Sequence, residues 1–181
     1  MSRPLAISAD NLTRYYGDRP ALDDVSFDVA QGDTLVVFGA NGAGKSTLLR
    51  LLSTLIRPHA GSLKVLGEDL PKDSWAIRGR VGLIGHEPLV YRDLTARENL
   101  VFTAKLNRVD KNEVDRILER VDLDKRADEP VRNFSRGMLQ RLATARALLP
   151  DPEVLLLDEP LANLDPGAAL LLEPFIGSAP H

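Results

Sequence analysis

The sequence contains no cysteine, and this absence excludes disulfide bonds, thiolate metal sites and a cysteine nucleophile. No apolar run approaches the ~20 residues that a membrane-spanning helix requires, and the first ten residues lack the apolar core of a signal peptide. The formal net charge is −3, so the chain has no overall basic field that would attract nucleic acid. We therefore expect a soluble cytoplasmic protein that reaches a membrane only through a partner.

What the chain does contain is the composition of an ordinary globular protein, with 44% hydrophobic and 27% charged residues over 181 positions. This length suffices for one substantial core and is short for two. Apolar segments between turn residues predict strands over residues 5–12, 21–29, 34–38, 63–66, 81–84 and 154–157. Helical spacing predicts one helix from Leu48 that ends at Pro58, and others over residues 96–106, 114–121 and 137–149. The helix predicted over residues 96–106 begins with a capping box formed by Thr95 and Glu98.

The most informative segment is GANGAGKST, Gly39–Thr47, which directly follows the apolar run Thr34–Phe38. A buried strand, a glycine-rich loop and a helix in this order form a phosphate-binding loop. Its glycines let backbone N–H groups turn toward phosphate, its lysine reaches the β- and γ-phosphates, and the following hydroxyl ligates Mg²⁺. The alternative is a chance glycine-rich turn. The predicted nucleotide contacts are Gly39, Asn41, Gly42, Gly44, Lys45, Ser46 and Thr47, with Lys45 also catalytic and Ser46 also a metal ligand.

A second motif, the acidic pair Asp158-Glu159, follows the apolar run Val154–Leu157. A phosphate-loop hydrolase needs such a pair opposite its loop: Asp158 would hold the Mg²⁺ hydration shell, and Glu159 would orient or deprotonate the attacking water. The alternative is an acidic surface turn. We expect a triphosphate and its Mg²⁺ to be held by Lys45 and Ser46 on one side and by Asp158 on the other.

The segment Asn133–Pro160 resembles the signature motif and Walker B segment of ATP-binding cassette (ABC) ATPases, and Asn163–Asp165 resembles their D-loop. This resemblance extends from about Leu5 to Leu172. It implies an α/β fold, with a P-loop NTPase core, an N-terminal antiparallel β subdomain and a helical insertion at about 88–149. One ABC ATPase domain would cover residues 1–173, followed by an atypical tail at 174–181.

The resemblance also implies functional roles. Tyr16 matches the aromatic residue that stacks on adenine; alternatively, it is a half-buried aromatic at a strand end. Ser135 and Gly137 would contact the γ-phosphate held by an opposite subunit, so ATP would join two ATPase domains as a homodimer or heterodimer. A lone monomer would then hydrolyse ATP poorly. The implied cofactors are ATP and Mg²⁺, and the implied partner is an integral membrane transporter subunit rather than nucleic acid.

Two positions depart from the family pattern. In Phe134–Met138, FSRGM, Arg136 replaces a glycine and would either attract phosphate or point into solvent. Aligning the loop after residue 84 puts His86 where the family has a Mg²⁺-binding glutamine, so His86 is a candidate metal ligand, although it could equally be a solvated loop residue. These two segments resemble the ATPase subunits of bacterial haem exporters in cytochrome c biogenesis, although drug and lipid exporters use related loops.

The end of the chain also departs from the family, whose members continue through a further strand and a histidine that contacts the γ-phosphate. Here the helix begun at Gly167 meets Pro174, and neither His59 nor His181 occupies the place of that histidine. We expect a truncated product that lacks the C-terminal core strand and has reduced stability and turnover. The leading function is an ATPase subunit for export. The alternatives are a nucleotide-binding fragment without turnover and a soluble ABC ATPase that acts on DNA or ribosomes.

Overall fold

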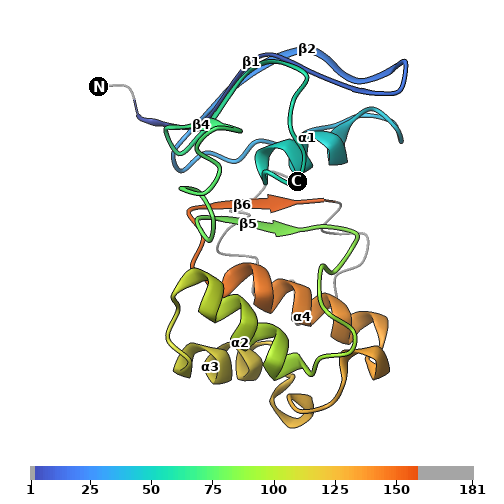
Figure 1. The fold of residues 1–181 in the computed structure, drawn as a ribbon, viewed down its shortest axis with the longest axis vertical. Helices are drawn as coiled ribbons and strands as arrows, with labels where there is room; N and C mark the ends of the chain where they lie inside the picture. Colours follow the sequence, from blue (N-terminus) through green and yellow to red (C-terminus); the bar gives the residue numbers. More distant parts are fainter. Residues whose placement is uncertain (1–2, 159–181) are drawn as a thin grey trace. The chain divides into compact units, whose positions relative to one another are not determined.

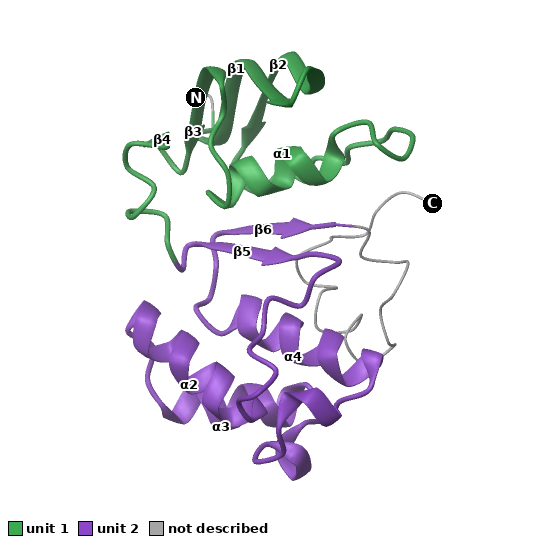
Figure 2. Cartoon of the chain, turned by 45° about the vertical axis from the view of Figure 1, so that its right-hand side comes forward, with its two compact units in different colours: residues 1–78 green, residues 79–181 purple. Residues whose placement is uncertain are grey.

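The computed structural model describes residues 3–158. The chain divides into two compact units, residues 1–78 and residues 79–181, which Figure 2 colours separately. The first unit is mainly strand and the second mainly helix, which agrees with the predicted α/β class. The single domain expected over residues 1–173 stays a prediction. The tail expected at 174–181 lies outside the described residues, so the expected lack of a C-terminal core strand stays a prediction too.

An antiparallel sheet forms the larger part of the first unit. Its strands lie in the order β2-β1-β3-β4 (Figure 2), namely β1 (Leu5–Tyr16), β2 (Arg19–Ala30), β3 (Ala60–Val65) and β4 (Glu68–Leu70). A two-residue turn that begins with Gly17 joins β1 to β2, and Gly17 has φ +58°, a conformation that glycine adopts without steric cost. The predicted N-terminal β region is confirmed. β3 begins three residues before the strand predicted over residues 63–66, because Ser62 and Ala60 pair with Asp10 and Thr13 of β1.

The phosphate loop leads into helix α1 (Lys45–Leu52). Leu48, Leu51 and Leu52 are its buried residues. The prediction that this helix reaches Pro58 is wrong. Thr54 has φ +63°, and the N–H groups of the next two residues both donate to the carbonyl of Arg50, which ends the helix before the proline.

The segment Thr34–Phe38, predicted as a buried strand, forms no strand within residues 3–158. Its apolar side chains are exposed, from 42% for Val37 to 89% for Phe38. No backbone hydrogen bond joins this segment to another described residue. The expectation of a buried strand is therefore wrong for this part of the chain. An apolar run becomes a strand only where a neighbouring strand supplies partners for its N–H and C=O groups.

The second unit contains a pair of parallel strands, β5 (Val81–Ile84) and β6 (Val154–Leu157), with the predicted bounds. The helices α2 (Ala96–Asn107), α3 (Asn112–Arg120) and α4 (Arg136–Leu148) lie on one side of this pair in Figures 1 and 2. Two short 3-10 turns, η1 (Asp124–Arg126) and η2 (Val131–Asn133), lie between α3 and α4. The three predicted helices of this region are confirmed to within about two residues.

Local chemistry explains how α2 starts and how closely α4 approaches β5. The Thr95 hydroxyl accepts from the Glu98 N–H at 3.1 Å, and the Glu98 carboxylate accepts from the Thr95 N–H at 2.8 Å. The predicted capping box is therefore present. A Cβ on Gly82 would lie 2.9 Å from the carbonyl oxygen of Ala147, so the glycine permits β5 to lie against α4.

The core of the second unit joins the three helices to β5. Its members are buried and mostly aliphatic, as expected for a tightly packed helical layer. Those that are at most 1% exposed are Ala96, Leu100, Ala104, Val114, Leu118, Leu123, Ala127, Val131, Leu142 and Ala145.

Candidate nucleotide-binding site

The phosphate loop depends on its glycines for two separate reasons. Gly42 and Gly44 have φ of +85° and +88°, a region that L side chains rarely adopt. Around Gly42 there is open space, whereas a Cβ on Gly44 would lie 2.0 Å from the carbonyl oxygen of Ala21 and 3.0 Å from Leu22. The backbone of the loop therefore packs directly on β2 at Gly44. This contact fixes where α1 begins.

Lys45 and the start of α1 concentrate hydrogen-bond donors at this loop. The Lys45 ammonium donates to the carbonyl oxygens of Gly39 and Ala40 at 2.7 and 2.9 Å. An ammonium has three donors, so these two bonds leave one available. The N-cap residue of α1 is Gly44, which offers no side-chain cap to the first N–H groups of the helix. Such a terminus attracts anions.

The remaining predicted contacts lie on the same loop. Asn41 and Ser46 are exposed, and Thr47 is half-buried within the first turn of α1. The structure therefore brings the predicted loop residues together in the first unit, with the Ser46 hydroxyl accessible from solvent.

The end of β1 lies close to this loop. Tyr16 pairs with Arg19 of β2, and the close approach of Gly44 is to Ala21, two residues further along the same strand. Two strand residues span roughly 7 Å. Tyr16, 47% exposed, thus pairs with β2 two residues away from the point where the loop contacts that strand.

The two tyrosines at this strand end have different neighbours. The Tyr15 ring stacks on His59 at a centroid distance of 6.1 Å and an interplanar angle of 25°. The guanidinium carbon of Arg14 lies 5.2 Å from the centroid of the Tyr16 ring. Arg14 and Tyr16 are two residues apart in a strand, which puts their side chains on the same face.

In the second unit, two predicted metal ligands follow neighbouring strand ends. Asp158 comes directly after β6, and its N–H donates to the carbonyl of Ile84, the last residue of β5, at 2.9 Å. His86 lies two residues beyond Ile84 and is exposed, whereas Asp158 is half-buried. The carboxyl ends of parallel strands are the usual edge for ligands in α/β sheets. Glu159, the predicted catalytic residue, lies outside the described residues.

The signature residues lie at the start of α4. Ser135 is the N-cap residue, and its hydroxyl oxygen accepts from the Met138 N–H at 3.3 Å. This bond uses the hydroxyl as an acceptor, so its proton remains free to donate. A Cβ on Gly137 would meet no atom within 4 Å, and Arg136 is exposed.

Sequence reasoning did not identify Arg14, His59 or Arg146 as residues of interest. Arg146 donates to the carbonyl of Leu83 at 3.0 Å, and burial lowers the pKa of its guanidinium. His59 joins β1 through contacts that span more than forty residues of sequence. Neither periodicity nor any short motif marks contacts of that range.

The donor set suits Mg²⁺ better than a metal held by the protein alone. Among residues 3–158 no group of three or more histidine, aspartate or glutamate side chains gathers to hold a metal. Mg²⁺ usually takes one or two protein oxygens and completes its shell with water and phosphate oxygens. The Ser46 hydroxyl in the first unit and the Asp158 carboxylate in the second are each an oxygen group of the kind that Mg²⁺ takes. No helix in the described part of the chain is long and apolar enough to cross a bilayer.

Comparison with known proteins adds three relatives among characterised transport ATPases. The chain is 42% identical over 165 residues to daunorubicin resistance ATP-binding protein DrrA3 of Streptomyces coeruleorubidus, covering 89% of this chain and 52% of that protein. It is 44% identical over 161 residues to bacitracin transport ATP-binding protein BcrA of Bacillus licheniformis, covering 88% and 53%. It is 38% identical over 172 residues to Nod factor export ATP-binding protein I of Sinorhizobium fredii, covering 93% and 50%. The chain thus spans about half the length of the curated relatives it matches.

Solved structures and a family model give the same result. The ATP binding subunit of an ABC transporter superposes with a TM-score of 0.84 and 30% identity over 94% of this chain and 73% of that one. A dimeric ATP-binding cassette in a post-hydrolysis state, bound to ADP and phosphate, shares the fold with a TM-score of 0.78 at 24% identity, over 91% and 78%. The model of the ABC transporter family matches residues 22–162, most of the sequence. The chain therefore belongs to the ABC transporter family of ATP-binding domains.

Proposed function

We propose that this chain binds ATP with Mg²⁺ and hydrolyses it to drive export by a membrane transporter subunit. The observation that carries the proposal is the built phosphate loop in the first unit. Gly44 lies too close to Ala21 for any side chain, Lys45 is anchored on loop carbonyls, and α1 begins without a side-chain cap. These features together support the proposal of a polyphosphate site.

Within the first unit, each loop residue has a role in holding the nucleotide. The N–H groups from Gly39 to Thr47 face the phosphates, and Lys45 offsets the charge that develops on the γ-phosphoryl oxygens. Ser46 provides a ligand to Mg²⁺, which supplies further charge neutralisation when it is bound. Tyr16 stacks on adenine, a role supported by its exposure beside the loop.

In the second unit, Asp158 would hold the hydration shell of a Mg²⁺ ion, and Glu159 would orient or deprotonate the attacking water. His86 is a candidate ligand at the adjacent strand end, and its exposure leaves the imidazole free to reach a metal. The free hydroxyl proton of Ser135 and the N–H of Gly137 would donate to the γ-phosphate on an opposing ATPase domain. ATP would then join two such domains, as a homodimer or a heterodimer.

The partners follow from the family. An integral membrane subunit would hold the ATPase at the cytoplasmic face, and no nucleic acid is involved. Relatives named for daunorubicin resistance, bacitracin transport and Nod factor export support the export direction. Haem remains a substrate hypothesis that rests on the segments Gly85–Pro88 and Phe134–Met138 alone. None of the three relatives is named for haem.

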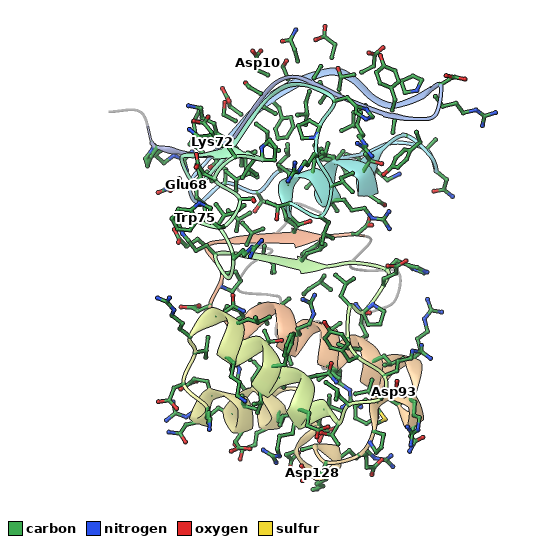
Figure 3. All side chains as sticks on the ribbon, viewed as in Figure 1. Asp10, Glu68, Lys72, Trp75, Asp93 and Asp128 are labelled. Atoms are coloured by element: carbon green, nitrogen blue, oxygen red, sulfur yellow. The ribbon has the colours of Figure 1, made fainter. Side chains whose placement is uncertain are left out.

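Replacing Lys45 tests the proposal. Lys45→Ala should lower phosphate release from ATP by on the order of a hundredfold or more, because the γ-phosphoryl charge loses its fixed cation. Lys72→Ala is the matched control, since Lys72 is an exposed lysine of the same unit, outside the loop (Figure 3). Turnover retained in the first variant would refute the assignment of the loop.

A second candidate function is nucleotide binding without turnover. The exposed segment Thr34–Phe38 favours it, because no described residue pairs with the strand expected to carry the loop. Calorimetric titration with ATP, together with the fluorescence of the single tryptophan, Trp75, measures binding independently of hydrolysis. Binding with phosphate release supports the first function, whereas binding without phosphate release supports the second.

A further inference from the structure

The end of β1 carries a cluster of four side chains, Arg14, Tyr15, Tyr16 and His59, which we call the β1-end cluster. His59 directly precedes β3, and its backbone N–H donates to the carbonyl of Thr13 at 2.9 Å. Its ring nitrogen Nδ1 accepts the Tyr15 N–H at 3.0 Å, and its ring stacks on that of Tyr15. One histidine therefore holds both the backbone and the ring of the residue before Tyr16.

On the other side of the cluster, Arg14 is fixed beneath Tyr16. Its Nη1 donates to the carbonyl of Arg57 at 3.0 Å and lies 3.2 Å from His59 Nε2. The guanidinium covers one face of the Tyr16 ring at cation–π distance. The opposite face of an exposed ring is then the one available for stacking.

These contacts indicate which protonation state of His59 fits the β1-end cluster. The Nδ1 that accepts the Tyr15 N–H carries no proton in this arrangement, so a neutral ring has its single proton on Nε2, which lies beside Arg14 Nη1 without accepting from it. A second proton on the ring would remove that acceptor and place two cations side by side, His59 and Arg14. Charged residues joined to the cluster by its contacts include Arg57, whose backbone carbonyl accepts from Arg14, and Arg19, which pairs with Tyr16 across β2. Asp24 is a third, since its N–H donates to the Thr13 hydroxyl. No ion pair within residues 3–158 supplies an acid to Arg14 or His59.

We infer that neutral His59 is a positioning residue for the adenine-stacking face of Tyr16, an inference that rests on the proposed function. By pinning the Tyr15 N–H and adjoining Arg14, it sets the direction in which the Tyr16 ring points. Protonation of His59 releases the strand end and repels the guanidinium that backs the ring. The base, rather than the phosphates, then loses its contact.

The test compares two ligands on the full chain: ATP, and inorganic tripolyphosphate, which has the phosphates and no base. Calorimetry gives the affinity ratio of the two from about pH 8 to about pH 5, the range in which histidine side chains change charge. The ratio cancels most of the titration that the two polyphosphates share. For the unaltered chain we expect it to fall about fivefold with decreasing pH, the size of one lost hydrogen bond.

Variants of His59 and Tyr16 distinguish a positioning role of His59 from a general effect on folding. His59→Asn keeps an acceptor near the Nδ1 position and cannot be protonated, so its ratio should equal that of the unaltered chain at high pH and stay flat. His59→Leu keeps the bulk without the acceptor and should have a low ratio at every pH. Tyr16→Ala should lower the ratio by about tenfold, also without pH dependence, because it removes the stacking surface itself.

Several results would overturn the inference. One is a His59→Asn variant that follows the pH response of the unaltered chain; another is a His59→Leu variant that matches that chain at high pH. A parallel change for both ligands would also overturn it, and so would a nitrogen-15 spectrum showing a proton on Nδ1 of His59 at neutral pH. If the unaltered chain binds neither ligand, the proposed function itself is wrong. If ATP binds tightly but Tyr16→Ala leaves the ratio unchanged, nucleotide binding stands and the positioning role does not.

Discussion

Replacing Gly44 with alanine would place a methyl group where the phosphate loop lies directly against β2. The new Cβ would lie 2.0 Å from the carbonyl oxygen of Ala21 and 3.0 Å from the Leu22 side chain. A backbone oxygen cannot rotate away as a flexible side chain can. The loop or the strand must therefore move, and the start of α1 moves with it.

The expected cost combines two terms. An L side chain at φ +88° costs about 1–2 kcal/mol of backbone strain. Forcing a methyl group into a closely packed position costs about 1–3 kcal/mol more. Gly42 isolates the first term, because its φ is +85° and a Cβ there would meet no atom within 4 Å. Gly44→Ala should therefore destabilise the first unit by about 1–3 kcal/mol more than Gly42→Ala does.

The assay is urea unfolding followed by circular dichroism at a strand wavelength, because the unit in which both glycines lie is mainly strand. Equal free energies of unfolding for the two variants would refute the argument, since they would show that the loop does not pack on β2 at Gly44. A Gly44→Ala variant as stable as the unaltered chain would refute both terms.

Two further predictions concern the second unit. Leu142→Ala should lower its free energy of unfolding by about 2–5 kcal/mol, because Leu142 is 0% exposed in the helical core. Circular dichroism at a helical wavelength measures this, and Leu106→Ala, at a residue 67% exposed, should change it by less than about 0.5 kcal/mol. Equal losses in the two variants would contradict the assigned core. Arg80 holds the Glu153 carboxylate through two hydrogen bonds of 2.6 and 3.2 Å, which lower the pKa of that carboxyl below its ordinary 4.5. A lowered carboxyl pKa contributes stability above the unfolded value and loses it as the pH falls through the folded value. Glu153→Gln should thus cost about 0.5 kcal/mol at neutral pH, after solvent screening of this exposed pair, and nothing in acid; a cost that persists in acid would refute the charge argument.

Local patterns were sufficient for much of the second unit. The Thr95–Glu98 capping box is present, and the runs Val81–Ile84 and Val154–Leu157 are strands with the expected bounds. Each of these elements is defined by neighbours in sequence: a cap by a residue three positions away, and a buried strand by a continuous apolar run. Pairing of the two runs as parallel strands also agrees with the expected core.

Local patterns failed where a distant neighbour decides the outcome. Thr34–Phe38 has the apolar character of a strand, yet no described residue pairs with its backbone. The helix expected to reach Pro58 ends at Leu52, because the carbonyl of Arg50 accepts two N–H groups across a left-handed residue. In both cases the composition was compatible with the expected element, and hydrogen-bond partners determined the result.

The sequence alone determined which functional groups are present and their order along the chain, from the phosphate loop at Gly39–Thr47 to the acidic residues after Val154–Leu157. Motifs of this kind are read from adjacent residues, since a loop that binds phosphate needs its glycines, lysine and hydroxyl at fixed short spacing. Only the tertiary structure decided which distant groups meet, such as Ala21 against Gly44, or His59 against the N–H of Tyr15. Contacts of this kind depend on how strands pair and how closely backbones approach, and no local pattern of residue types encodes either quantity.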